Sequence, residues 1–216
     1  MSYRYFDGRP PSLEVILERK DAYPCSLWRE TDLSVVFDAP AQLSMTERLT
    51  LLSLVLGLRP ERALEVGSFR GGSAQIIVHA MDLNKAGELV MVDPRPQLAD
   101  GLWSTISHRA TLLAESSPEA LHSIDGDFEF VFIDADHTRS GVLADVTAVA
   151  ERLRPGGVII LHHVLYEESR AGIEEALQST DLIDCGSLCT NASFDEAGRS
   201  WAGLGMLRKP VVKGLR

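Results

Sequence analysis

The stretch Arg62-Ala63-Leu64-Glu65-Val66-Gly67-Ser68-Phe69-Arg70-Gly71-Gly72-Ser73 determines the expected fold of this chain. Its first five residues form a short apolar run that is typical of a buried strand, and its glycines provide a turn before a helix that begins at Ser73. The same succession of strand, turn and helix recurs further along the sequence. This recurrence predicts a parallel sheet, because neighbouring parallel strands have to be joined by long crossover connections, which are usually helical.

Five strands of this kind are expected, each followed by a helix. The expected strands are residues 62–66, 88–93, 110–114, 128–134 and 158–161, and the helices that follow them are 73–83, 98–107, one that opens at Ser117, 139–153 and 167–177. Right-handed crossovers would cover both faces of the sheet with helices. Two further strands, near 182–190 and 201–208, have no helix between them and predict an antiparallel hairpin at one edge. The expected class is α/β, with a doubly wound, mostly parallel, Rossmann-like sheet.

The segment before the first strand contains a helix with a clear start. Ser44-Met45-Thr46-Glu47 has the spacing of a capping box, and Gly57 is expected to end the helix, as Pro155-Gly156-Gly157 is expected to end helix 139–153. The first forty residues hold four prolines and one helical stretch, 12–20. We expect a single domain over residues 1–216, in which residues 1–43 are an appendage that caps the active site.

Composition limits the kinds of partner. The chain of 216 residues has a formal charge of −10 and no run of Lys or Arg, which argues against nucleic acid and favours a small neutral or cationic substrate. No apolar stretch is long enough for a signal peptide or a membrane span. The three cysteines are an odd number, which suggests free thiols in a reducing compartment such as the cytoplasm, and Cys185 with Cys189 alone would be too few ligands for a structural zinc site. A homodimer is left open.

Ligands of open α/β sheets bind beyond the carboxyl ends of the strands. After the first strand, Gly67 and Gly71 lie four residues apart, so the sequence has neither the dinucleotide fingerprint nor a phosphate loop. Glu65 would repel a pyrophosphate but attract an ammonium group, and a ligand carboxylate could bind the free N–H groups near Ser73. The alternative is a glycine turn that serves packing alone.

Polar residues also follow the second and third strands. Asp93 is placed to bind both hydroxyls of a ribose, although an Asp at a strand end can equally cap a helix. Ser116 and Ser117 are placed to contact an adenine or to cap the next helix, and both interpretations remain open.

Several segments taken in order, 65–73, Asp93, 130–137 and 153–161, resemble the successive motifs of class I S-adenosylmethionine-dependent methyltransferases. The chain is most similar to the metal-dependent small-molecule O-methyltransferases, which include catechol O-methyltransferase and bacterial sugar O-methyltransferases of natural-product pathways. The resemblance covers residues 44 to about 166.

The resemblance implies S-adenosylmethionine as the cofactor and assigns roles to individual residues. The methionine part would be held by Glu65, Gly67, Ser68, Gly71 and Ser73, the ribose by Asp93 and the adenine by Ser116 and Ser117, with Asp134 also at the cofactor. Asp134 would be a metal ligand and His137 the catalytic base. After the fifth strand, where this branch has acidic or Asp/Asn side chains, the sequence has His162-His163, which would complete a divalent metal site of a different kind.

Adjacent residues of a strand point to opposite faces, so a metal site with both histidines and one with a single histidine remain open. Asp136 and Asp145 are expected to be surface or capping acids. The expected function is methyl transfer to a hydroxyl of a sugar or natural-product intermediate, with a histidine base. The alternatives are a metal-independent methyltransferase, a non-catalytic cofactor-binding module, and a nicotinamide-dependent oxidoreductase on a similar sheet.

Overall fold

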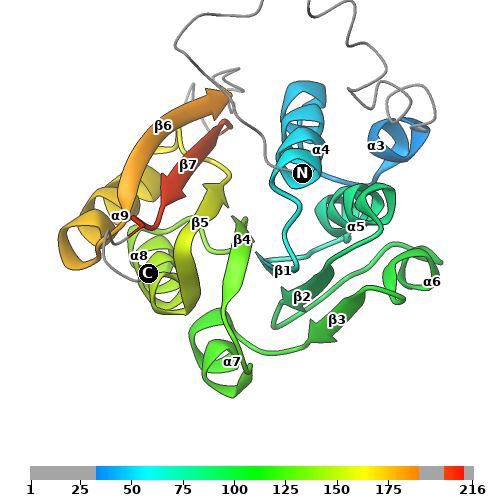
Figure 1. The fold of residues 1–216 in the computed structure, drawn as a ribbon. Helices are drawn as coiled ribbons and strands as arrows, with labels where there is room; N and C mark the ends of the chain where they lie inside the picture. The colour runs from blue at the N-terminus through cyan, green and yellow to red at the C-terminus, as the bar shows by residue number, and fades with distance from the viewer. Residues whose placement is uncertain (1–32, 190–201, 212–216) are drawn as a thin grey trace, which may run out of the picture. The chain divides into compact units, whose positions relative to one another are not determined.

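A seven-stranded sheet organises the part of the chain that the computed structural model describes, residues 33–189 and 202–211 (Figure 1). The strands are β1 (Arg62–Val66), β2 (Glu88–Val92), β3 (Ala110–Leu113), β4 (Phe128–Ile133), β5 (Leu153–Leu161), β6 (Ile183–Cys189) and β7 (Leu204–Arg208), in the order β3-β2-β1-β4-β5-β7-β6. Strands β1 to β5 are parallel, and β7 pairs antiparallel with both β5 and β6. The parallel sheet and its antiparallel edge are therefore confirmed.

Helices cover both faces of this sheet. They are α3 (Ser34–Asp38), α4 (Met45–Leu58), α5 (Gly72–Asn84), α6 (Leu102–Ile106), α7 (Ser117–Ser123), α8 (Arg139–Arg152) and α9 (Glu167–Ser179). Figure 1 shows α7, α8 and α9 on one side of the sheet and α4, α5 and α6 on the other. Leu64 and Val66 belong to the core beneath α7, α8 and α9. Because side chains alternate along a strand, Glu65 points to the face that α4 and α5 cover.

Two helix ends differ from the expectation. Helix α4 continues through Gly57 and ends at Leu58. Arg59 caps it with a left-handed φ of 51° and donates its N–H to the Val55 carbonyl. The cost of a glycine in a helix, about 1 kcal/mol, is outweighed here by the burial of neighbouring leucine and valine side chains. Helix α8 ends at Arg152, before the Pro-Gly-Gly triplet.

The triplet Pro155-Gly156-Gly157 lies inside β5 instead of ending the helix. Pairing with β4 passes from Phe128–Leu153 to Phe130–Val158, so the intervening residues bulge out of the ladder. The backbone of Lys209 holds this bulge through bonds with the Gly156 N–H at 2.9 Å and the Gly157 carbonyl at 3.0 Å. The glycines and proline therefore shape a bulge that tertiary pairing stabilises.

Arg48 of α4 holds the segment that precedes this helix. Its guanidinium and Nε donate to the carbonyls of Val36, Phe37, Ala39, Ala41 and Leu43 at 2.6–3.0 Å. A Cβ at Gly72, the first residue of α5, would lie 2.2 Å from the Ala41 backbone nitrogen, so this segment packs directly on the start of α5. Residues 33–43 of the expected appendage are thus described, whereas residues 1–32, including the expected helix 12–20, lie outside the described residues.

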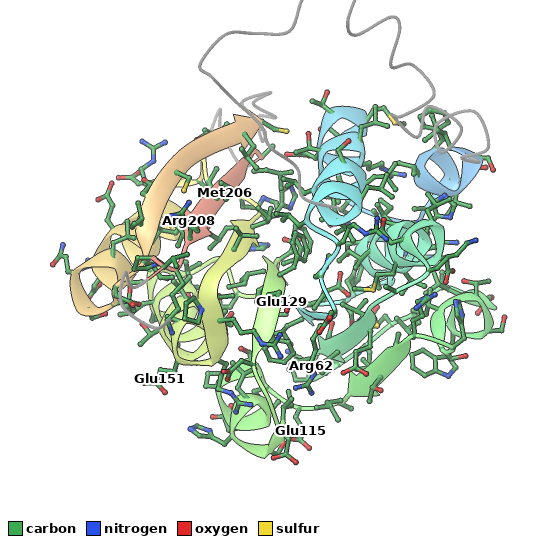
Figure 2. The ribbon with its side chains drawn as sticks, viewed as in Figure 1. Arg62, Glu115, Glu129, Glu151, Met206 and Arg208 are labelled. Atoms are coloured by element: carbon green, nitrogen blue, oxygen red, sulfur yellow. The ribbon has the colours of Figure 1, made fainter. Side chains whose placement is uncertain are left out.

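Ion pairs occupy the amino-terminal end of the strands. Arg62 pairs with Glu88 at 2.9 Å, and Glu129 accepts a hydrogen bond from the Glu61 backbone at 2.6 Å; Figure 2 labels Arg62 and Glu129 at this end. The opposite end of the sheet, at the carboxyl ends of the parallel strands, is where ligands of such sheets bind. Among the described residues, no helix is long and apolar enough to cross a membrane.

Candidate active site

A cavity of about 820 Å³ opens at the carboxyl ends of the parallel strands. This volume is within the range of sites that hold a small organic ligand. Among the residues predicted from sequence, those that line it are Gly67, Ser68, Ser73, Asp93, Ser116, Ser117, Asp134, His137 and His163. Glu65, Gly71 and His162 do not line it.

The glycine turn after β1 is shaped by packing between chain segments. Gly67 has φ 86°, and a Cβ there would lie 2.2 Å from the Asp134 carbonyl oxygen. Gly71 has φ 80°, and its Cβ would meet Leu102 at 2.6 Å and Leu98 at 2.9 Å. Both glycines allow β1 to turn close to neighbouring segments, which at Gly71 favours the packing alternative that the sequence left open.

Glu65 is fully buried on the α4 and α5 side of the sheet. Neither of its carboxylate oxygens has a hydrogen-bond partner among the described residues. Burial, together with the charges of Asp134 and Asp93, outweighs the nearby Ser73 hydroxyl, which favours the charged form of Glu65, and raises the pKa of Glu65 to about 8. Two residues near Glu65 line the cavity: Gly67, two positions along the chain, and Ser73, in the first turn of α5. An unpaired buried carboxyl is costly unless it is protonated or offset by a nearby cation.

Asp93 braces the turn after β1. Its Oδ2 accepts from the backbone N–H groups of Ser68 and Phe69, at 2.9 and 2.8 Å, and its Oδ1 accepts from the Arg95 backbone at 2.8 Å. Burial opposes ionisation, but these hydrogen bonds outweigh it and lower the pKa of Asp93. Phe69 has a φ of 41°, so Asp93 stabilises an unfavourable backbone conformation. Oδ1, which accepts a hydrogen bond from the Arg95 backbone, is the oxygen with acceptor capacity left for a ligand.

Asp134 directly follows β4 and lies among three histidines. Its Oδ2 is 3.2 Å from His162 Nδ1, and its Oδ1 is 3.4 Å from His163 Nε2 and 4.0 Å from His137 Nε2. The rings of His137 and His163 have centroids 4.1 Å apart. Burial opposes ionisation of Asp134, but His162 and His163 outweigh it and hold its pKa well below the usual range.

Both adjacent histidines reach Asp134. Strand β5 ends at Leu161, and His162 still bonds to the β4 backbone through its N–H. His163 lies beyond the strand with a left-handed φ of 57°, so strand alternation no longer dictates where its side chain points. Asp134, His162 and His163 each offer a ligand atom, and these atoms lie within 4.8 Å of one another.

Glu47, the capping-box residue of α4, is a member of this cluster that sequence analysis missed. Its Oε2 accepts from the Ser44 backbone at 2.7 Å, while its Oε1 accepts from the Gly203 backbone at 2.9 Å and lies 3.4 Å from His162 Nε2. Burial opposes ionisation of both groups, yet their attraction lowers the pKa of Glu47 to about 2, and Asp134 and Glu47 raise the pKa of His162 to about 9. No local pattern could have revealed this contact.

His137 stands at the edge of the cavity with 41% of its side chain exposed. Partial burial and the neighbouring His163 lower its pKa, so the imidazole is neutral near pH 7. A neutral imidazole at the cavity surface can accept a proton from a bound hydroxyl.

The two aspartates that were expected to be surface or capping acids differ from one another. Asp136 is exposed and accepts from the Thr138 backbone at 2.9 Å, as expected of a capping acid. Asp145 is buried and lines the cavity with Ser117, which corrects the expectation for it. Its position three residues after Val142 on the inward face of α8 is a periodicity signal that could have revealed its burial.

The donor set fits a divalent metal ion. Spacings of 3.2 and 3.4 Å between the Asp134 oxygens and the histidine nitrogens are those of neighbouring ligand atoms that each lie about 2.0–2.2 Å from one ion. A carboxylate with two imidazoles is a donor set for Mn²⁺, Fe²⁺, Co²⁺, Ni²⁺ or Zn²⁺ rather than Mg²⁺.

Residues 64–164 match a family model described as "Methyltransferase domain". No curated protein matches the sequence. Among solved structures, a putative O-methyltransferase from Klebsiella pneumoniae is 20% identical, with 90% of this chain and 95% of that chain covered and a TM-score of 0.60. The Bacillus cereus O-methyltransferase in complex with SAH is 21% identical (91% and 97% covered, TM-score 0.61). The O-methyltransferase TomG of Streptomyces achromogenes, in complex with SAM, is 17% identical (91% and 96% covered, TM-score 0.62). At these identities the structures establish the shared fold.

Proposed function

We propose that this chain is an S-adenosylmethionine-dependent methyltransferase that transfers the methyl group to a hydroxyl oxygen of a small molecule. The methyltransferase-domain match at residues 64–164 and the fold around it support this proposal. The observation that carries the proposal is the convergence of Asp134, His137 and His163 on one cavity at the carboxyl ends of β4 and β5. Methyl transfer to oxygen needs an oriented hydroxyl and a proton acceptor beside it, and this cluster offers both.

The cofactor would lie along the turn after β1. The carboxylate of its methionine part would bind the free N–H groups at the start of α5, near Ser73. Its ammonium group would lie above Glu65, whose carboxyl is behind the cavity wall; a cation there would favour the ionised form of Glu65 and offset its burial. Asp93 Oδ1 would accept from a ribose hydroxyl, and Ser116 and Ser117 would be at the adenine.

His137 would be the general base. It is neutral near pH 7, and its Nε2 lies 4.0 Å from Asp134 Oδ1, which would stabilise the imidazolium that forms when the ring takes the acceptor proton. The proton would move from the acceptor hydroxyl to a ring nitrogen as the oxygen attacks the methyl carbon. The carbon–sulfur bond breaks in the same step and leaves S-adenosylhomocysteine.

Asp134, His162 and His163 would hold a divalent ion, which, when bound, lowers the pKa of the acceptor hydroxyl and fixes its position. The contact of His162 with Glu47 favours a second candidate, a metal-independent enzyme. An imidazolium between the carboxylates of Glu47 and Asp134 already balances their charge, as an ion would. In that case His163 and His137 would orient the acceptor hydroxyl without help from a metal ion.

A sugar or another hydroxylated natural-product intermediate is the proposed acceptor class; the solved structure of TomG, described as involved in tomaymycin synthesis, gives a structural parallel. The test is turnover of methyl-labelled cofactor with matched panels of sugars, phenols and amines. Label in a sugar or phenol ether would support the proposal, label in an amine product would contradict it, and tight cofactor binding without turnover on any panel would favour the non-catalytic module.

A further inference from the structure

Asp145 is a buried acid in the wall of the cavity. It lies on α8, is 5% exposed, and faces the end of the cavity formed by the loop after β3. Its neighbour Ser117, the first residue of α7, is 6% exposed and lines the same end. Two polar side chains from different helices are thus more than nine-tenths buried and border one hollow.

These two groups do not satisfy one another. The Ser117 hydroxyl lies close enough to favour the charged form of Asp145, yet it meets hydrogen-bond geometry with no described atom. Burial, followed by the charges of Asp136 and Glu119, raises the pKa of Asp145 to about 6. No ion pair of Asp145 with Lys, Arg or His occurs among the described residues. A buried carboxyl in this situation gains from a ligand that donates a hydrogen bond to it.

The proposed position of the cofactor determines which ligand group comes to Asp145. The methyl end is fixed by Asp134 and His137, the methionine part by the start of α5, and the ribose by Asp93. The nucleobase then occupies the remaining end of the cavity, between the loop after β3 and α8. An adenine carries an exocyclic amino group, a donor that matches a carboxylate.

On the basis of the proposed function, we infer that Asp145 recognises the exocyclic amino group of the adenine and makes the site selective for adenine over hypoxanthine. A carboxylate accepts a hydrogen bond from the amino group. In hypoxanthine a carbonyl oxygen replaces that group, so two acceptors would face one another in a buried site. Ser117, with a hydroxyl that can both donate and accept, would contact the same edge of the base.

The test is calorimetric titration of the full chain with S-adenosylhomocysteine and with S-inosylhomocysteine. The wild-type chain should bind the adenine compound at least about tenfold more tightly, the usual effect of a hydrogen bond to a charged group. Asp145→Asn, whose amide can donate to the carbonyl of hypoxanthine, should bring the two affinities within about threefold of each other. Glu119→Gln, which removes an exposed acid at the same end of the cavity, should keep the wild-type ratio.

A ratio unchanged in Asp145→Asn would overturn the inference even if both affinities fell together, because a purely structural role weakens both ligands alike. Asp145→Ala provides a second check, since it removes the acceptor and should also lose the preference. Melting temperatures of the variants with and without ligand show that they are folded. If wild-type protein bound neither compound, the proposed function itself would fail; if it bound and turned over S-adenosylmethionine with no dependence of the ratio on Asp145, only this inference would fail.

Discussion

His162 Nε2 lies 3.4 Å from Glu47 Oε1, and both side chains are 2% exposed. Glu47 therefore does two things at once: it closes the capping box that starts α4, and it is one of two carboxylates that flank a histidine of the candidate site. Glu47 also accepts from the Gly203 backbone. The start of α4, the end of β5 and the approach to β7 are thus connected through one buried side chain.

Glu47→Gln should make metal-free protein less stable at neutral pH and flatten its stability at alkaline pH. The folded-state pKa of His162 is raised from 6.5 to about 9, so its stabilising contribution is present below 6.5 and is lost as pH rises through about 9. The amide can still cap Ser44 but no longer attracts the imidazolium, so the pKa of His162 should fall and about 1–3 kcal/mol should be lost near pH 7. Urea unfolding with chelator present, at pH values on both sides of this window, measures the change. An identical pH dependence in the two proteins would contradict the role of this contact.

Glu65→Gln should remove a loss of folding stability with rising pH that comes from a buried acid instead of a histidine. The folded-state pKa of Glu65 is raised from 4.5 to about 8. Between these two pH values the folded protein binds more protons than the unfolded chain, so wild-type stability falls as pH rises through this window. The shift corresponds to about 5 kcal/mol at most. The variant should lack this decline in the ligand-free state, while its affinity for S-adenosylmethionine falls because the ammonium group loses its counter-charge. A variant that keeps the decline would show that another group titrates.

His137→Ala should lower kcat by roughly 10² to 10⁴-fold with cofactor affinity nearly unchanged, the usual cost of losing a general base. In the parent enzyme, activity should rise with pH through the lower part of the histidine range, because the pKa of His137 is lowered. The matched control is His122→Ala, an exposed histidine in the last turn of α7. Full activity in His137→Ala would show that another group takes the proton.

Chelation tests the metal site. Activity that a chelator removes should return better with Mn²⁺, Fe²⁺, Co²⁺, Ni²⁺ or Zn²⁺ than with Mg²⁺, and Asp134→Asn should lose metal binding and most activity together. Metal affinity should rise with pH up to about 9, because His162 has to lose its proton to become a ligand. Undiminished turnover after exhaustive chelation, with no metal found by elemental analysis, would support the metal-independent enzyme instead.

The positions of the strands and helices could be predicted because they follow from local patterns. The apolar run before Gly67 and the capping box at Ser44 act over a few residues, so the sequence displays them directly. The Pro-Gly-Gly triplet after α8 misled because Lys209, more than fifty residues away, pairs with it and converts an expected helix stop into a bulge of β5.

The residues of the candidate site could be predicted from the sequence, but their contacts with distant parts of the chain could not. The resemblance to O-methyltransferases indicated Asp134, His137 and the two histidines, and their places after strands of a parallel sheet agree with it, because the carboxyl ends of parallel strands share one edge. The neighbours of these residues come from elsewhere in the chain: Glu47 reaches His162 from α4, and Asp145 reaches the cavity from α8. Gly71 required the tertiary structure as well, since a side chain there would meet Leu98 and Leu102.

The central claim is tested most directly by calorimetric titration of the purified chain with S-adenosylmethionine, S-adenosylhomocysteine and NADH. The buried acid at the end of β1 and the absence of a phosphate loop disfavour a pyrophosphate, so the two sulfur compounds should each bind at one site per chain and raise the melting temperature, whereas NADH should do neither. Binding of NADH without binding of either sulfur compound would contradict the account.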